Sequence, residues 1–411
     1  MRSGSRSPLA PDRFPPLPPV AGARFAAVAA EIRYRGRPDL ALMAFEPGTA
    51  VAGVFTRSKT AGHPVLWCRR ILPAGRARAL IVNAGNANVF RGREGDAAVA
   101  AEAEAVAAAL DCLPQEVFVA STGVIGERLP VEKITGRIRE LAANLREEAL
   151  AGVAQAILTT DTFAKGASAR TEIGGVPVTI AGVAKGSGMI APDMATMLAF
   201  LVTDARLPPP LLQGLLEPAV DRSFNAITVD GDTSTSDTVL LFATGRAQHG
   251  LPSGPEDPML AAFRTALEAV MRDLACQIVR DGEGARKFVT IRVAGAVEER
   301  SARRIGLAIA NSPLVKTAIA GEDANWGRIV MAVGKAGEPI DPARLSIAFG
   351  GHVVARDGRA VPDLDEAPVA AHLRGREVEI AVTVGEGPGV ATVWTCDLTH
   401  GYIDINASYR S

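Results

Sequence analysis

The sequence predicts a mixed α/β protein in which layered sheets are flanked by helices. Short runs rich in Val and Ile alternate with longer segments of Ala, Leu and Glu, and several hairpin-like turns lie between them. This alternation is unlike that of a helical bundle or an all-β sandwich. With 411 residues, the chain is long enough for two or three domains with real cores.

The order of apolar runs predicts which segments form strands and which form helices. Buried or half-buried strands are expected at 78–85, 116–122 and 175–184. Partly alternating runs after about residue 287 predict further strands at 287–297, 344–355, 377–387 and 389–407. Apolar residues at helical spacing predict helices at 95–112, 133–150, 208–221 and 257–279.

The charge balance excludes some classes of protein. The chain has 44 Lys and Arg against 45 Asp and Glu, a net charge of −1, so we expect neither a nucleic-acid partner nor an anionic membrane surface. Four scattered cysteines without a C-x-x-C pair fit a reducing compartment. No apolar stretch is long enough for a transmembrane helix or a secretory signal. We therefore expect a cytoplasmic protein in which residues 1–20 form a flexible Pro-rich tail.

Most familiar site motifs are missing. The sequence has no G-x-S-x-G, no H-E-x-x-H and no Walker A motif, and its histidines lie far apart, so no metal site is expected. The run 186–191 matches a dinucleotide fingerprint, but Pro192 follows it where a helix should open. Asp230, Asp232 and Asp237 lack the glycine and the closing Glu of a calcium loop, so we interpret them as turn or supporting residues.

One threonine lies in a setting that suits a nucleophile. Glycine-rich sequence precedes Thr196, small residues lie directly before it, and an apolar run follows. A threonine hydroxyl needs a base beside it, and cleavage of the preceding peptide bond would supply its own α-amine. Taken from the residues alone, a structural threonine bonded to a backbone carbonyl remains the alternative.

Eight short segments of the sequence, taken in order, resemble the conserved blocks of one known family. Together they are similar to the ornithine acetyltransferase family, also called the glutamate N-acetyltransferase family of arginine biosynthesis. The resemblance extends from about residue 25 to the C-terminus. The blocks lie at 83–97, 121–130, 159–165, 185–198, 223–238, 281–287, 311–329 and 405–411.

The resemblance implies a self-processing enzyme of the same layered fold. Cleavage between Ala195 and Thr196 would give an α chain, with its folded part at 21–195, and a β chain, 196–411, whose C-terminal domain begins at about 287. Thr196 would be the nucleophile, and Thr122 and Gly123 would form the oxyanion hole. A glycine there lets backbone N–H groups approach the developing charge. A plain strand-to-loop turn is the alternative for this pair.

The same resemblance assigns an amino-acid site. Its residues would supply donors for a carboxylate and a carboxylate for an ammonium group. Ser411 stands where the family more often has threonine, and it keeps the hydroxyl. The implied residues are Thr159, Lys185, Thr196, Glu283, Asn406 and Ser411.

The implied reaction moves an acetyl group from N-acetyl-L-ornithine to L-glutamate through acetyl-Thr196, in a ping-pong cycle that needs no cofactor. Some members also acetylate glutamate with acetyl-CoA as co-substrate, and no residue here decides whether this chain does. The family implies an α2β2 heterotetramer. Two alternatives remain: an N-terminal-nucleophile amidohydrolase or aminopeptidase on a related fold, and a non-catalytic amino-acid-binding homologue.

Overall fold

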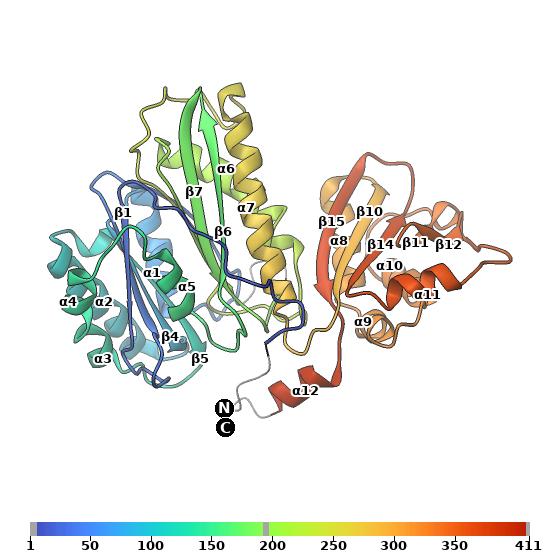
Figure 1. Cartoon of the computed structure of the whole chain (residues 1–411), viewed down its shortest axis with the longest axis horizontal. Helices are drawn as coiled ribbons and strands as arrows, with labels where there is room; N and C mark the ends of the chain where they lie inside the picture. Colours follow the sequence, from blue (N-terminus) through green and yellow to red (C-terminus); the bar gives the residue numbers. More distant parts are fainter. Residues whose placement is uncertain (1–5, 192–196, 408–411) are drawn as a thin grey trace. The chain divides into compact units, whose positions relative to one another are not determined.

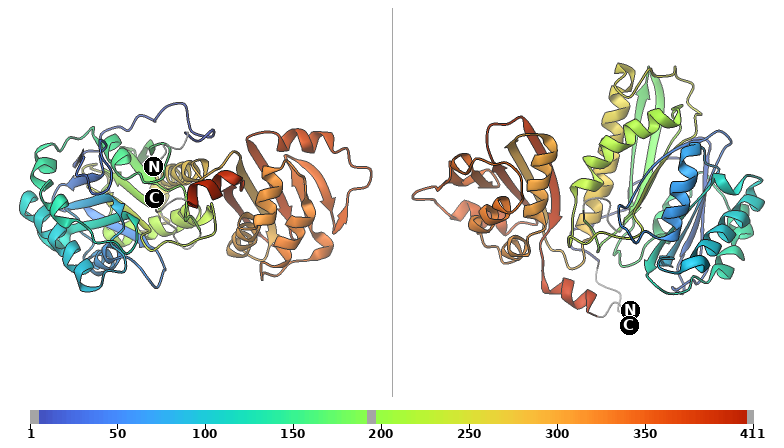
Figure 2. Two further views of the ribbon diagram at one scale, coloured as in Figure 1. Left: turned by 90° about the horizontal axis from the view of Figure 1, so that it is seen from below. Right: turned by 180° about the vertical axis from the view of Figure 1, so that it is seen from behind.

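The computed structural model describes residues 6–191 and 197–407 (Figures 1 and 2). The chain forms two compact units. The larger unit comprises 12–225 and 232–278, and the smaller comprises the N-terminal residues up to 11, the segment 226–231 and everything from 279 onward. No helix in the two described ranges is long and apolar enough to cross a membrane.

The larger unit contains two sheets. The first has the order β1-β2-β4-β5, and β4 and β5 are parallel. Its strands are β1 (Ala23–Val28), β2 (Leu40–Phe45), β4 (Ala79–Asn86) and β5 (Val117–Val124). The second has the order β3-β9-β8-β7-β6, and β8 and β9 are parallel. Its strands are β3 (Ala50–Phe55), β6 (Lys165–Ile173), β7 (Val176–Lys185), β8 (Leu198–Thr203) and β9 (Thr238–Ala243).

The two sheets pack face to face over one apolar core. Phe45 of the first sheet stacks on Phe242 of the second with ring centroids 4.3 Å apart, and Phe118 meets Phe242 edge-on at 6.1 Å. The helices α1 (His63–Ile71) and α5 (Leu150–Ala156) add apolar side chains to the same core. The strands of both sheets are apolar on this face because each is buried there.

Helices cover the outer faces of both sheets (Figure 1). A second apolar cluster joins the first sheet to α2 (Gly92–Leu110), α3 (Val131–Thr135) and α4 (Ile138–Ala143). The second sheet is flanked by α6 (Pro209–Asp221), which contacts β3 and β9, and by α7 (Ala261–Arg280), which contacts β6 and β7. Gln213 of α6 and Gln277 of α7 each exchange two hydrogen bonds with a backbone glycine on an edge strand, which occupies the groups that an edge would otherwise expose.

The smaller unit is one six-stranded sheet of order β13-β12-β11-β14-β10-β15. Its strands are β10 (Phe288–Ala296), β11 (Ser346–Phe349), β12 (His352–Arg356), β13 (Arg359–Ala360), β14 (Glu377–Thr383) and β15 (Gly389–Cys396). Apolar side chains of the sheet pack with four of the five helices, and Trp326 packs against this core. The helices are α8 (Glu299–Ala310), α9 (Pro313–Ala320), α10 (Trp326–Gly334), α11 (Ala367–Leu373) and α12 (His400–Asn406), of which α12 stands apart from the core.

The predicted mixed α/β class and its layered sheets are confirmed, as are the strands at 78–85, 116–122 and 175–184. Two element predictions are wrong. The helix expected over 133–150 is broken into α3, α4 and the start of α5, with Gly136 and Arg137 between the first two. The strand expected over 389–407 ends at Cys396, and the Thr399 hydroxyl then caps α12 by accepting a hydrogen bond from the Gly401 N–H.

The Pro-rich segment differs from the flexible tail expected over 1–20. Within its described part, Phe14 and Leu17 pack against the core of the larger unit, and Val20 is fully buried. A Cβ atom at Gly166 would lie 2.7 Å from the Phe14 ring, so the strand below is shaped to receive this segment. The expected domain start at about 287 also shifts, because the C-terminal segment of the smaller unit begins at 279, near the end of α7.

Candidate active site

Thr122 and Gly123 lie at the end of β5, beside the parallel strand β4. Gly123 has φ +129°, and a Cβ atom there would lie 2.3 Å from the carbonyl carbon of Gly85 on β4. Only glycine fits this close approach of two backbones. The chain after Thr122 is therefore held in a conformation that a side chain at 123 would prevent.

Lys185 connects this strand end to the second sheet. It is the last residue of β7, and its Nζ donates a hydrogen bond of 3.2 Å to Thr122 Oγ1. Both side chains are buried. Because the hydroxyl oxygen accepts this bond, the hydroxyl hydrogen of Thr122 remains a donor. A positive charge behind a hydroxyl strengthens it as a donor to an anion.

Asp161 organises the backbone around Lys185. Its Oδ1 accepts hydrogen bonds from Lys165 Nζ at 2.7 Å and from the N–H of Gly186 at 2.7 Å, and its Oδ2 accepts one from the N–H of Thr159 at 3.0 Å. Burial raises the pKa of Asp161, but the charges of Lys165 and Lys185 and these hydrogen bonds outweigh it and hold the pKa below the usual range. Asp161 is therefore an ionised carboxylate.

Asp237 directly precedes β9, and its Oδ1 accepts a hydrogen bond of 2.9 Å from the N–H of Met197, the residue before β8. Burial raises the pKa of Asp237 well above its usual value, against the opposing effects of that hydrogen bond and of the Lys185 charge. Ala195 and Thr196, predicted as the cleavage site and the nucleophile, lie outside the described residues.

Two other predicted residues meet in the smaller unit. Asn406, at the end of α12, donates from Nδ2 to Glu283 Oε2 at 2.7 Å. A Cβ atom at Gly284 would lie 2.4 Å from the backbone nitrogen of Tyr402, so the loop that carries Glu283 packs directly on α12. Thr399 Oγ1 also donates to the Gly284 carbonyl at 2.7 Å. Ser411 lies outside the described residues.

The predicted residues thus fall into two groups. In the larger unit, Asp161 links Thr159 to the strand end that carries Lys185, and Lys185 contacts Thr122. In the smaller unit, Glu283 contacts Asn406. Asp161 and Lys165 were not predicted as organising residues, although both lie in the block at 159–165. Residues 186–191, which match the dinucleotide fingerprint, are not helical, and the residues directly after them lie outside the described part of the chain.

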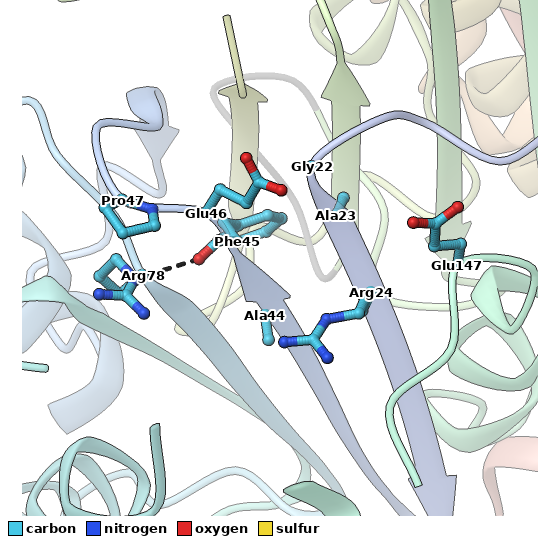
Figure 3. Close-up of a pocket in the computed structure, with 9 residues that line it drawn as sticks. All are labelled: Gly22, Ala23, Arg24, Ala44, Phe45, Glu46, Pro47, Arg78 and Glu147. Carbon is cyan, nitrogen blue, oxygen red and sulfur yellow. Dashed lines mark hydrogen bonds between the residues drawn. The ribbon is translucent and has the colours of Figure 1, made fainter. Parts of the chain in front are cut away.

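A small pocket of about 160 Å³ lies elsewhere in the larger unit (Figure 3). Arg78 Nε donates to the Phe45 carbonyl at 3.1 Å along one side of it. The pocket is smaller than the roughly 300–1,000 Å³ of ordinary ligand sites, and none of the predicted site residues lines it. Its lining residues are Gly22, Ala23, Arg24, Ala44, Phe45, Glu46, Pro47, Arg78 and Glu147.

Sheets packed face to face between helices, with buried ionised and hydroxyl groups gathered at their strand ends, define a layered α/β enzyme. The family model of the ArgJ family matches residues 24–411, and the chain belongs to that family. It is 59% identical over 405 residues to the arginine biosynthesis bifunctional protein ArgJ of Gluconobacter oxydans, covering 98% of this chain and 95% of that protein. The resemblance seen in the sequence is confirmed.

Two further similarities were found. The protein of the same name from Bradyrhizobium diazoefficiens is 55% identical over 412 residues, with both chains covered completely. Among solved structures, the argJ protein of Bacillus halodurans is 42% identical, with a TM-score of 0.48 over 50% of this chain and 96% of that one.

Proposed function

We propose that the chain transfers an acetyl group from N-acetyl-L-ornithine to L-glutamate through an acetyl ester of Thr196. Family membership over 24–411 supports this proposal, since the relatives are named arginine biosynthesis proteins. Cleavage after Ala195 would free the α-amine of Thr196; the Thr196 hydroxyl would then attack the acetyl carbonyl while its proton passes to that amine. The C–N bond then breaks, and the proton leaves with the amine of ornithine. Glutamate reverses these steps on the ester.

The hydrogen bond from Lys185 to Thr122 carries the proposal. It joins the two sheets at one point and leaves the Thr122 hydroxyl with a hydrogen to donate. The tetrahedral intermediate of acetyl transfer needs such a donor, aimed from a water-poor site at the developing oxyanion. The N–H groups around Gly123 would complete this oxyanion hole.

The substrate amino acid would be held by charge and amide groups. Lys185 and Thr159 would bind its carboxylate, while Glu283, Asn406 and Ser411 would bind its ammonium end and side chain. The pair formed by Asn406 and Glu283 supports a common role for these two residues. We propose that the processed chains assemble as an α2β2 heterotetramer in the cytoplasm and act without a resident cofactor.

A second reaction is also proposed, because the relatives are named bifunctional. Acetyl-CoA would acetylate the same threonine, and glutamate would take the acetyl group from it. No new nucleophile is needed.

One assay tests the function. Purified protein receives N-acetylornithine with and without glutamate, and ornithine, acetate and N-acetylglutamate are measured. We expect ornithine and N-acetylglutamate in equal amounts only when glutamate is present. Ornithine and acetate without glutamate would favour an amidohydrolase, and no turnover would favour a binding protein. Denaturing electrophoresis should show two fragments, of which the second begins Thr-Met-Leu-Ala-Phe.

A further inference from the structure

Met197 is held at both of its backbone polar groups by the start of β9. Its N–H donates to Asp237 Oδ1 at 2.9 Å, and its carbonyl accepts a hydrogen bond of 3.2 Å from the N–H of Thr238. The N–H of Met197 belongs to the peptide group that joins it to Thr196. Asp237 therefore binds the one covalent link between Thr196 and strand β8.

The N–H of Met197 donates to a side chain at a position where a β-ladder would supply a backbone carbonyl. Leu198 pairs with Thr238 in the parallel ladder of β8 and β9. If the ladder continued by one residue, the N–H of Met197 would donate to the carbonyl of Ser236. That carbonyl instead accepts from the Thr238 hydroxyl at 3.1 Å. At Met197, the residue next to Thr196, a hydrogen bond to the Asp237 carboxyl group therefore takes the place of the ladder hydrogen bond.

The surroundings of Asp237 make this replacement costly. Its side chain is fully buried, and its Oδ2 finds no hydrogen-bond partner among the residues that the structure describes. An unpaired buried polar atom costs free energy. An apolar residue at 237 would avoid that cost but would leave the N–H of Met197 without this acceptor, so the carboxyl group serves the backbone next to Thr196.

We infer that Asp237 is a positioning residue for Thr196. The inference rests on the proposed function where it concerns turnover. After cleavage, Thr196 would be a chain terminus, and termini fray unless they are tied down. The bond to Asp237 keeps the first peptide group of the β chain on β9 in the cut and uncut chain. This bond would thereby fix the place of the peptide group through which Thr196 is attached to the sheet, and a reacting group needs such a fixed place.

The test compares two substitutions at one position. Asp237→Asn keeps an acceptor oxygen for the Met197 N–H, whereas Asp237→Leu has a similar size and no acceptor. We expect Asp237→Asn to cleave and turn over nearly as the wild type does. Asp237→Leu should cleave more slowly and lose about 100-fold in kcat once cut, because small displacements of a reacting group have effects of that order. KM for N-acetylornithine should change little.

Asp204 supplies a matched control at the opposite end of β8. Its Oδ1 accepts a backbone hydrogen bond of 2.8 Å from Thr179, so Asp204→Leu removes the same kind of bond from the same sheet. We expect it to lower the melting temperature without changing cleavage rate or kcat. Equal losses in Asp204→Leu and Asp237→Leu would overturn the inference. So would normal cleavage and kcat in a folded Asp237→Leu enzyme.

Cleavage can be measured by electrophoresis without any substrate. The positioning role of Asp237 can therefore be tested separately from the proposed acetyl transfer. If the wild type cleaves but transfers no acetyl group, the proposed function fails. The effect of Asp237 on the cleavage rate is still measured in that case. If Asp237→Asn is as slow as Asp237→Leu in cleavage, the acceptor is not what matters, and the positioning role is refuted.

Discussion

Asp161 and Glu102 are both fully buried carboxyl groups in the larger unit, yet their surroundings differ completely. Asp161 receives three hydrogen bonds and faces the charges of Lys165 and Lys185, whereas Glu102, on α2, finds no hydrogen-bond partner among the described residues. The pKa of Asp161 is lowered, while burial raises that of Glu102 to about 8. Burial alone therefore does not decide the charge of a carboxyl group; its partners do.

The comparison shows what the negative charge of Asp161 does in the fold. A buried ion pair is weak evidence for stability, because desolvation offsets most of the attraction. The ionised Asp161 instead fixes backbone groups on both sides of the strand end that carries Lys185. The neutral Glu102 lies in the apolar cluster under α2 and fixes no described group.

The largest effect should follow from Asp161→Ala. The change leaves Lys165 without its carboxylate and removes the acceptor for Gly186 and Thr159. Breaking a buried pair by removing one partner costs about 3–5 kcal/mol. We expect a loss of that size in denaturant unfolding. Asp161→Asn, which keeps the acceptor oxygen, should lose less. A cost below about 1 kcal/mol would show that the cluster is not held by this carboxylate.

Thr122→Ala tests the same cluster through catalysis. If the Thr122 hydroxyl stabilises the oxyanion, kcat should fall about 100- to 1,000-fold, or roughly 3–4 kcal/mol. A structural hydroxyl should instead cost only about 1 kcal/mol of stability and spare turnover. The measurement is kcat on enzyme shown to be cut, with the melting temperature recorded alongside. Near-normal kcat would leave the oxyanion to Gly123 and other backbone donors.

Glu102→Gln tests the unpartnered carboxyl. The folded-state pKa of about 8 lies above the usual 4.5, so the contribution of Glu102 to stability is fully present below about pH 4.5 and is lost as pH rises through 8. The neutral amide has no such dependence. We expect the variant to be more stable than the wild type by about 3 kcal/mol at pH 7 relative to their difference at pH 4. Parallel pH curves for the two proteins would contradict the raised pKa.

Arg137→Ala should have the smallest effect. Arg137 and Glu140 form an exposed ion pair at 2.8 Å, and both side chains are nearly half exposed. Such pairs contribute about 0.5 kcal/mol or less, since water screens them. A denaturant midpoint close to the wild type is expected, with Glu140→Ala as its match. A loss of stability as large as that of Asp161→Ala would mean that an exposed ion pair contributes as much as a buried one.

The sequence predicted the parts of the fold that local pattern controls. Continuous apolar runs identified the strands at 78–85, 116–122 and 175–184, because a strand buried on both faces is apolar throughout. The break within 133–150 was not visible, since apolar spacing persists across it although the backbone turns at Gly136 and again near Asn144. The helix α12 was missed because its apolar residues also fit an alternating strand.

For the site, the family resemblance predicted Thr122, Lys185, Glu283 and Asn406. The apolar run that ends at Thr122 also predicted that Gly123 lies at a strand end. Which groups touch was decided only by the tertiary structure. Lys185 meets Thr122 from another sheet, and Asp237 meets Met197 across a strand pair forty residues apart. Burial raises the pKa of Glu102, whereas that of Asp161 depends on the nearby Lys165 and on Lys185, which folding brings to it from the end of β7. A carboxyl group carries its chemistry in the sequence, but folding alone decides whether water, a lysine or nothing surrounds it.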